Sequence, residues 1–239
     1  MRREFEEGFV KYNIHGTKMK LLKYLEEKPY ILVEFECGYL KKTRVIAFKE
    51  GKIRSPKCRT ICGIGYLDGE TSFHGTKYYN TWKGLIARCN GKDKFYLDCT
   101  LDKKWESLSN FKKWFENNYY EIDSETMDLD KDILVKYNRV YGENTCIFVP
   151  HSINCLFSGG IDITYTQNDK YMVRGIVDGK RIGLGTYENY NYARSIAIEN
   201  KERHINNTLL KYKYKIPEKI YKALEYRGRM FILDLIDEI

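Results

Sequence analysis

The chain of 239 residues is long enough for one large domain or for two to three small ones, each with its own core. Lysine and arginine number 41 against 33 aspartate and glutamate, and this net charge of +8 favours a polyanionic partner. No stretch approaches the roughly 20 consecutive apolar residues of a membrane span, and the N-terminal sequence MRREFEEGFVKYNI has no apolar signal-peptide core. We therefore expect a cytoplasmic protein with no membrane contact, whose seven cysteines are reduced thiols.

The first predicted module covers residues 1–70 and is rich in β-structure. The run from Ile31 to Phe35 is β-branched and aromatic, and Cys37-Gly38 is typical of a tight turn into a following strand, Tyr39 to Arg44. These patterns predict a small, curved sheet. The stretch from Thr17 to Glu27 fits a strand of that sheet or, by propensity, a helix.

The second predicted module, residues 71–157, contains two amphipathic helices. In YYNTWKGLIARC one helical face carries an apolar stripe, and SLSNFKKWFENNYY starts with Ser and Asn caps before a second such stripe. Aromatic stripes at this spacing indicate packed cores rather than stacking surfaces. The residues of the two stripes are Tyr78, Trp82, Leu85, Ile86 and Cys89, followed by Leu108, Phe111, Trp114 and Phe115.

The third predicted module covers residues 158–239 and follows the Gly159-Gly160 boundary. Three short strands fit IDITYTQ, KYMVRGIV and KRIGLGTY, and Asp178-Gly179 between the last two is a strong hairpin signal. A helix fits residues 188–210, and a short final helix is expected after Pro217. The fold class predicted for the whole chain is α+β, and it ends in a three-stranded antiparallel sheet packed on a helix.

The third module contains an aromatic and basic strand, a Gly-Lys turn, a Leu-Gly-Thr-aromatic strand and a helix behind them. In this order of features it resembles the Apetala-two type of DNA-binding domain. The resemblance implies that the sheet binds double-stranded DNA. The positions that carry the resemblance are Tyr171, Arg174, Gly179-Lys180, Leu184-Gly185-Thr186-Tyr187 and Ala193.

Alternation along the middle strand decides which side chains share a face of this sheet. Tyr171 and Val173 lie on one face, and Arg174 lies on the opposite one. Lys180 and Arg181, at the hairpin, suit phosphate contacts; the alternative is that they are solvated charges on a hairpin. We therefore assign DNA contacts to Arg174, Lys180, Arg181 and Tyr171.

The segment LDKDILVKYNRVYGENTCIFVPHSIN resembles the ββα-metal element of phage HNH endonucleases of the homing type. The upstream runs TWKGLIARC and KKWESLSNFKKWFENN, together with FKEGKIRSP and GIGYLDGE, extend the resemblance over nearly the whole chain. HNH chemistry uses one metal, a general base and an Asn that holds the metal-binding loop. By position, the resemblance implies Asp130 and Asn154 as ligands for magnesium or manganese, and Asn144 and Thr145 at the structural Asn position.

Lys131 stands where the HNH pattern has its general base. A lysine with an unperturbed pKa of about 10.4 is protonated at neutral pH and cannot accept a proton. Burial could lower the pKa of Lys131, or His151, three residues before Asn154 on the same helical face, could take the role. Alternatively, His151 is an ordinary surface residue. Asp128 and Asp132 are either further ligands or strand-end charges.

Three functional hypotheses follow from these residues. The first is a phage-type DNA-binding protein that nicks or cuts its target with magnesium or manganese, in the cytoplasm of the host cell. The second is a catalytically inactive, DNA-bound regulator, which the lysine at the base position favours. The third is a phage-encoded inhibitor of a bacterial defence system, such as an anti-CRISPR protein, whose partner is a host protein rather than DNA.

Overall fold

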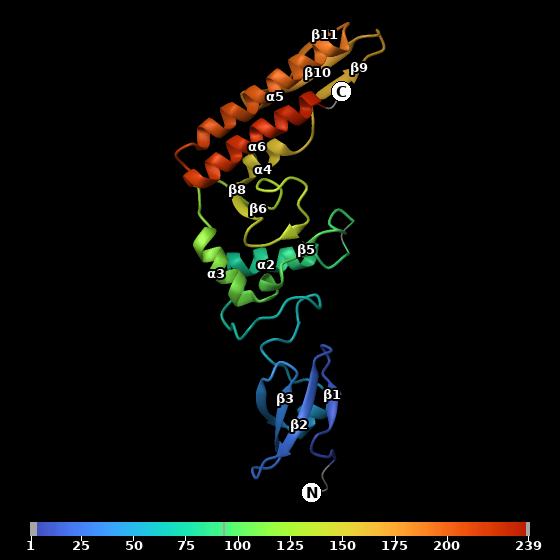
Figure 1. Cartoon of the computed structure of the whole chain (residues 1–239), viewed down its shortest axis with the longest axis vertical. Coiled ribbons are helices and arrows are strands. Elements are labelled where there is room, and N and C mark those ends of the chain that lie inside the picture. The colour runs from blue at the N-terminus through green and yellow to red at the C-terminus, as the bar shows by residue number, and fades with distance from the viewer. Residues whose placement is uncertain (1–3, 93, 238–239) are drawn as a thin grey trace. The chain divides into compact units, whose positions relative to one another are not determined.

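The structure is a computed structural model that describes residues 4–92 and 94–237 (Figure 1). It confirms the predicted α+β class. The chain divides into two compact units: unit 1 is Met1–Asn118 with Arg139–Asn144, and unit 2 is Tyr119–Asn138 with Thr145–Ile239. This two-way division does not test the three predicted modules, which stay a prediction. No disulfide bond joins any of the seven cysteines, all of which lie within the described residues. Within the described residues, no helix is long and apolar enough to cross a membrane.

Unit 1 begins with a four-stranded antiparallel sheet, whose strands pair in the order β1 (Val10–Tyr12), β2 (Lys18–Tyr24), β3 (Tyr30–Phe35) and β4 (Leu40–Arg44). β2 is a strand and not the alternative helix, because Met19 and Leu21 are fully buried whereas Lys20 between them is exposed. A short helix that was not predicted, α1 (Val45–Lys49), follows β4 directly. Its Phe48 completes the core of the sheet.

The second part of unit 1 contains the two predicted amphipathic helices, α2 (Lys77–Arg88) and α3 (Leu108–Asn118). Trp82 of α2 donates its indole N–H to the carbonyl of Trp105, at 2.7 Å, in the 3-10 helix η1 (Lys103–Glu106). The predicted apolar stripe of α3 is buried throughout. These aromatic side chains therefore form a core, as their spacing indicated.

The stripe predicted on α2 departs from the structure at Tyr78 and at Cys89, which is also half-buried and follows the end of the helix. Tyr79 is buried, whereas Tyr78 is half-buried. The ring of Tyr78 packs at the edge of the helix pair, 6.3 Å from the ring of Phe115. The helix is rotated so that Tyr79 meets Phe73, 4.6 Å away between ring centroids, and Phe73 lies before the helix and outside its periodic pattern.

Unit 2 begins with a strand, a long connection, a second strand and a short helix. β6 (Met127–Asp130) pairs antiparallel with β8 (Ile147–Pro150). α4 (His151–Asn154) follows β8 at once and continues as the 3-10 helix η2 (Cys155–Phe157). The connection between the strands contributes β7 (Val140–Tyr141) to unit 1, where β7 pairs in parallel with β5 (Thr100–Leu101).

The predicted three-stranded antiparallel sheet is present, with the order β11 (Lys180–Tyr187), β10 (Tyr171–Val177) and β9 (Asp162–Tyr165). Asp178 and Gly179 join β10 to β11 with φ values of 50° and 76°. Two successive positive φ values define the hairpin turn that an Asp-Gly pair favours. The hairpin prediction is therefore confirmed.

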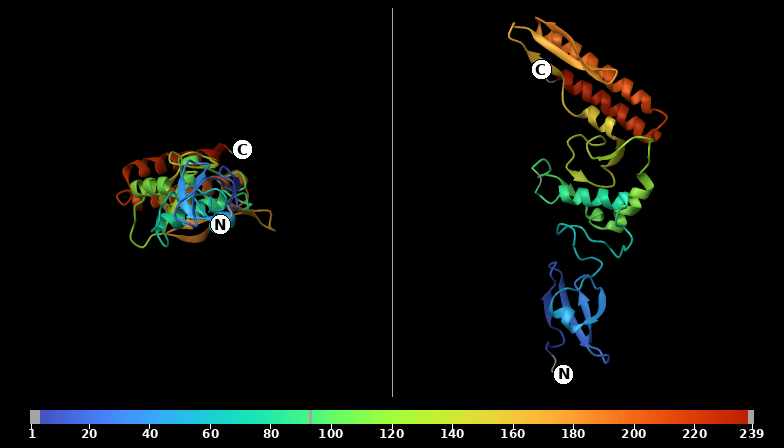
Figure 2. Two further views of the ribbon diagram at one scale, coloured as in Figure 1. Left: turned by 90° about the horizontal axis from the view of Figure 1, so that it is seen from below. Right: turned by 180° about the vertical axis from the view of Figure 1, so that it is seen from behind.

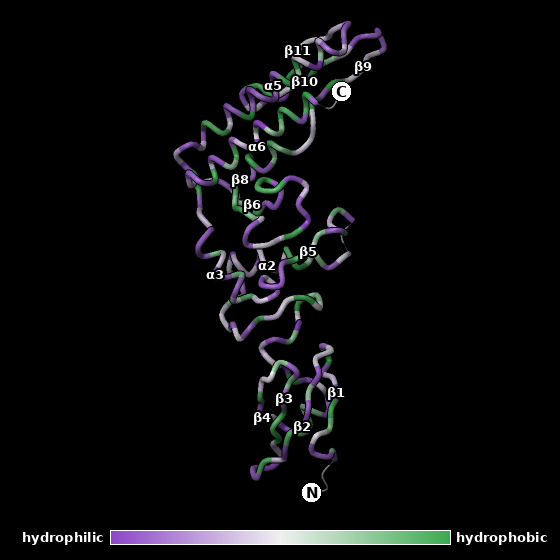
Figure 3. Tube along the Cα trace, in the orientation of Figure 1, coloured by the Kyte–Doolittle hydropathy of each residue, from purple (hydrophilic) through white to green (hydrophobic). Residues whose placement is uncertain are grey.

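Two long helices complete unit 2, α5 (Tyr190–Tyr212) and α6 (Glu218–Asp237), and they lie side by side in both sets of views (Figures 1 and 2). Hydrophobic and hydrophilic residues are interspersed along both helices (Figure 3). α6 begins after Pro217, as predicted, but it is 20 residues long instead of short. The C-terminal half of α6 is helical because it buries Ile232 and Leu235 in the core to which α4 and α5 also contribute.

Asn200 of α5 completes the hydrogen bonding along one edge of β10. β9 pairs with β10 only as far as Arg174, so the backbone of Ile176 has no strand partner on that side. The amide of Asn200 replaces the strand: its Oδ1 accepts the N–H of Ile176 at 3.1 Å, and its Nδ2 donates to the Ile176 carbonyl at 3.4 Å. Asn200 is 8% exposed, and its amide provides partners for both backbone groups of Ile176.

The close approach of Asn200 requires glycine at position 175. A Cβ on Gly175 would lie 2.1 Å from Asn200 Oδ1 and 2.6 Å from Leu184 Cδ1.

Gly175→Ala should therefore lower the free energy of unfolding by about 1–3 kcal/mol, the usual cost of overpacking. Gly183→Ala, on the neighbouring strand, is the control because nothing lies within 4 Å of its added Cβ. Urea unfolding followed by circular dichroism measures both, and equal stabilities would contradict the role assigned to Asn200.

Candidate functional site

The C-terminal sheet has one face against α5 and one open face. Val173 is fully buried and packs on Ala193 and Ala197 of α5. Arg174, the next residue, therefore points to the open face, as the alternation predicted. Ile176 lies two residues further along that face and pairs directly with Arg181 of β11, so both arginines belong to the same surface.

Asp162, at the start of β9, lies between these two arginines. Its carboxylate forms an ion pair with Arg181 and lies 3.7 Å from Nη1 of Arg174. Arg174 also donates from Nη1 to Thr164 Oγ1 at 3.5 Å. One carboxylate thus orients two guanidinium groups while it neutralises only one charge. The open face keeps a net positive charge at a fixed position.

The other two predicted DNA contacts lie elsewhere on the sheet. Tyr171 belongs to the face that packs on α5, and its ring lies 5.2 Å from that of Tyr190. Lys180 is exposed at the hairpin, opposite Val177. The structure therefore brings Arg174 and Arg181 together, places Lys180 beyond them at the turn, and separates Tyr171 from this face.

A basic groove follows the edge of β10 where Asn200 binds. Two hollows, of about 350 and 380 Å³, share Ile176, Asn200 and His204 in their linings. Lys201 lines the first hollow and Lys211 the second. Burial lowers the pKa of His204, and the positive charges of Lys201 and Lys211 lower it further.

Asp130, at the end of β6, is held by the backbone that follows it. Its Oδ1 accepts the N–H groups of Asp132 and Ile133, both at 2.7 Å. Burial nevertheless raises the pKa of Asp130, since desolvation outweighs the two hydrogen bonds. This geometry occupies one carboxylate oxygen and leaves Oδ2 as the atom that can meet a cation.

Asp128, two residues earlier, connects β6 to α4. Its Oδ2 accepts from His151 Nδ1 at 2.7 Å and from Asn154 Nδ2 at 3.0 Å. The bond uses the amide nitrogen of Asn154, so its amide oxygen can face a cation. The other ring nitrogen of His151, Nε2, lies 3.5 Å from Cys155 Sγ. A carboxylate on Nδ1 orients an imidazole and makes Nε2 the acceptor.

The contacts of Lys131 do not suit a general base. Its ammonium forms an ion pair with Asp132 at 2.6 Å, and its side chain is 10% exposed. An ammonium group has no lone pair with which to accept a proton. His151 thus has the better geometry of the two candidate bases. Asn144 is exposed in unit 1, and Thr145 belongs to unit 2 with its Oγ1 3.9 Å from Cys146 Sγ.

The two predicted metal ligands, Asp130 and Asn154, line the same pocket of about 290 Å³. Among the described residues, no group of three or more His, Cys, Asp or Glu side chains could hold a metal ion. Magnesium commonly binds through one or two protein oxygens and takes its other ligands from water and substrate phosphate. The residues therefore fit a site that substrate completes. The remaining lining residues are Asp132, Ile133, Cys155, Phe157, Ser158 and Arg227.

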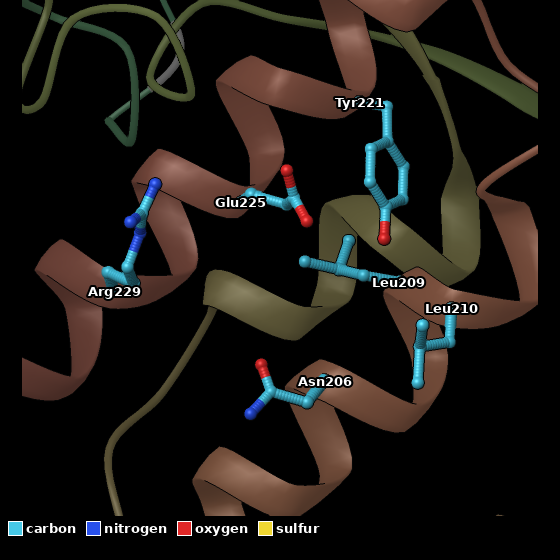
Figure 4. Close-up of a pocket in the computed structure, with 6 residues that line it drawn as sticks. All are labelled: Asn206, Leu209, Leu210, Tyr221, Glu225 and Arg229. Carbon is cyan, nitrogen blue, oxygen red and sulfur yellow. The ribbon is translucent and has the colours of Figure 1, made fainter.

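A separate hollow of about 420 Å³ lies between α5 and α6 (Figure 4). Leu209 and Leu210 of α5 face Tyr221 and Glu225 of α6 across it. It shares no lining residue with the pocket of Asp130.

Comparisons with family models, curated proteins and solved structures found no match for this chain. Function is therefore inferred from the residues themselves.

Sequence reasoning missed Asp162, His204, Arg227 and the role of Asp128. Asp162 could have been found from the turn at residues 166–170, which joins β9 to β10. Counting outward from this turn in an antiparallel register places Asp162 opposite Arg174. The others depend on contacts between elements distant in the chain. No periodic signal marks them.

His204 gives a pH dependence whose sign follows from its environment. Its pKa in the folded protein lies below the ordinary value of 6.5, so the unfolded chain binds the proton more tightly. Stability is retained above the unfolded pKa and is lost as the pH falls through the folded value. We expect the free energy of unfolding to fall less between pH 7 and pH 5 in His204→Gln. Urea unfolding across this range tests it, and identical pH profiles for the two proteins would contradict it.

Proposed function

We propose that the chain binds double-stranded DNA through the open face of its C-terminal sheet. The observation that carries the proposal is the pair Arg174 and Arg181, oriented by the single carboxylate of Asp162. A guanidinium group forms bidentate hydrogen bonds with phosphate or with the edge of guanine. A small antiparallel sheet has the width to enter the major groove. The net charge of +8 is consistent with such a partner.

The shape of the face also supports the proposal. The register places Thr164 and Met172 beside each other and Gly183 opposite Arg174, so short or flexible side chains surround the arginines. Backbone phosphates or base edges can therefore approach both guanidinium groups closely. Lys180 at the hairpin extends the positive surface toward one end of the sheet. The groove with Lys201 and Lys211 offers further phosphate contacts.

Replacing both arginines tests this proposal. Arg174→Gln with Arg181→Gln should lower DNA affinity by about 10- to 100-fold at moderate salt. If both residues contact phosphates, the slope of log K against log salt should become shallower by about 2. Fluorescence anisotropy of a labelled duplex at several salt concentrations measures both quantities.

The matched control removes two positive charges from other surfaces. Arg59 is ion-paired with Glu106 in unit 1, and Lys222 with Glu218 on α6, and both side chains are exposed. Arg59→Gln with Lys222→Gln should leave the affinity nearly unchanged. A flat salt dependence in the unmodified protein would overturn DNA binding. A stable complex with a host protein, formed without DNA, would favour the inhibitor hypothesis instead.

We further propose that unit 2 nicks the bound DNA in an HNH-like reaction that depends on magnesium or manganese. The observation in favour is that Asp130 and Asn154 line one pocket, beside a histidine held by Asp128. When bound, the cation would supply Lewis-acid stabilisation of charge on the phosphate. Asp130 and Asn154 would hold it through oxygen atoms. His151 would accept a proton from water at Nε2, and Asp128 would stabilise the resulting imidazolium.

Supercoiled plasmid incubated with magnesium or manganese tests the nicking activity. Asp130→Ala with Asn154→Ala should abolish nicking, and His151→Ala should reduce it by about 100-fold or more, the usual contribution of a general base. Lys131→Met should retain activity if His151 is the base. Gel electrophoresis of nicked and supercoiled forms gives the rates. Intact DNA binding without metal-dependent nicking would favour the inactive regulator.

A further inference from the structure

Arg227 of α6 extends into the pocket that Asp130 and Asn154 line. Its side chain is 11% exposed. The guanidinium group lies against two aromatic rings, with its central carbon 5.7 Å from the ring centre of Phe157 and 5.9 Å from that of Phe231. The two rings contact each other, with centroids 6.1 Å apart and planes at 64°, so the guanidinium packs beside this ring pair.

The guanidinium has little compensation for its charge. Within residues 4–92 and 94–237, its Nε and Nη1 are buried without a hydrogen-bond partner. The ion pair described for it is with Asp234, whose Oδ2 lies 3.9 Å from Nη1. The same oxygen lies 2.6 Å from Lys136 Nζ, so Asp234 is already closely paired. A buried cation in this state is costly unless something else supplies acceptors.

The lining of the pocket indicates which ligand supplies hydrogen-bond acceptors to Arg227. A guanidinium offers a planar fork of donors that matches two oxygens of a phosphate group. Asp130 and Asp132 in the same lining would repel an anion by themselves. A divalent cation held by Asp130 and Asn154 offsets this repulsion and bridges to phosphate oxygens. The three residues thus complement a phosphate group and a divalent cation bound together.

We propose that Arg227 binds a phosphate group of the nucleic-acid backbone in this pocket, together with the divalent cation. The inference rests on the proposed function, because it takes DNA as the source of the phosphate. Arg227 lies 73 residues after Asn154, the last residue of the ββα segment, so α6 would contribute a substrate-binding residue to that segment. The distance of 3.9 Å to a carboxylate already paired with Lys136 gives the donors of Arg227 no close acceptor.

Arg227→Met separates the two roles because methionine keeps an apolar chain against Phe157 and Phe231 and removes the charge. The melting temperature of full-length protein is measured in magnesium chloride, with inorganic phosphate or with chloride at equal ionic strength. Phosphate should raise the melting temperature of the unmodified protein and leave that of Arg227→Met unchanged. Without phosphate, Arg227→Met should melt at the same or a higher temperature.

Arg229→Met is the matched control, since it removes one positive charge from the same helix at an exposed position that lines a different hollow. It should keep the phosphate-induced shift. Loss of the shift in both variants, or no shift in the unmodified protein, would overturn the proposal. So would a lower melting temperature of Arg227→Met without phosphate together with an unchanged phosphate shift.

A second measurement uses duplex DNA with calcium in place of magnesium. Arg227→Met should bind about 10-fold more weakly than the unmodified protein in calcium, and the difference should narrow in chelator. Failure of the proposed function gives a different result. Replacing Arg174 and Arg181 would then leave DNA affinity unchanged, while phosphate would still raise the melting temperature of the unmodified protein. Loss of that shift with normal DNA binding overturns only the role of Arg227.

Discussion

The hydrogen bonds of Asn200 to the edge of β10 are the constraint on which the arrangement of the C-terminal sheet depends. They satisfy the backbone N–H and carbonyl of Ile176, which β9 is too short to reach. They also hold β10 against α5 where Gly175 allows close approach. Because strand faces alternate, fixing Gly175 toward α5 fixes Arg174 toward the open side. The position of the proposed DNA-binding arginines is therefore set by a buried amide on the opposite face of the strand, and the basic groove lies along the same edge.

Unit 2 places its charged groups in two different environments. On the open sheet face, Asp162 and the arginines are solvated, so their interactions are weak and depend on salt. In the pocket, burial raises the pKa of Asp130, and among the described residues Nε and Nη1 of Arg227 have no hydrogen-bond partner. The first environment suits rapid, reversible contact with many phosphates. The second suits a single phosphate that arrives with its own counter-charge.

How far the sequence predicts the structure depends on whether the deciding contacts are local. The buried stripe of α3 and the Asp178-Gly179 hairpin follow from spacing and turn chemistry, and both are confirmed. Tyr78 was assigned to the core because it fits the helical period, but contact with Phe73 selects Tyr79 instead. In the candidate site, the sequence placed Asp130, His151 and Asn154 near one another. It could not reveal that Asp128 binds the latter two, or that Arg227 reaches the pocket from α6, because both depend on tertiary packing.

If the proposed cation and phosphate bind in this pocket, we expect them to bind with positive coupling. A phosphate alone would meet the carboxylates of Asp130 and Asp132, and a cation alone would leave the guanidinium of Arg227 unpaired. Each ligand therefore improves the site for the other, and by linkage the effect is the same in both directions. This coupling requires no bond cleavage. An inactive regulator with the same pocket would still bind DNA more tightly in the presence of divalent cations, so metal-dependent affinity and metal-dependent nicking report on different properties of the same residues.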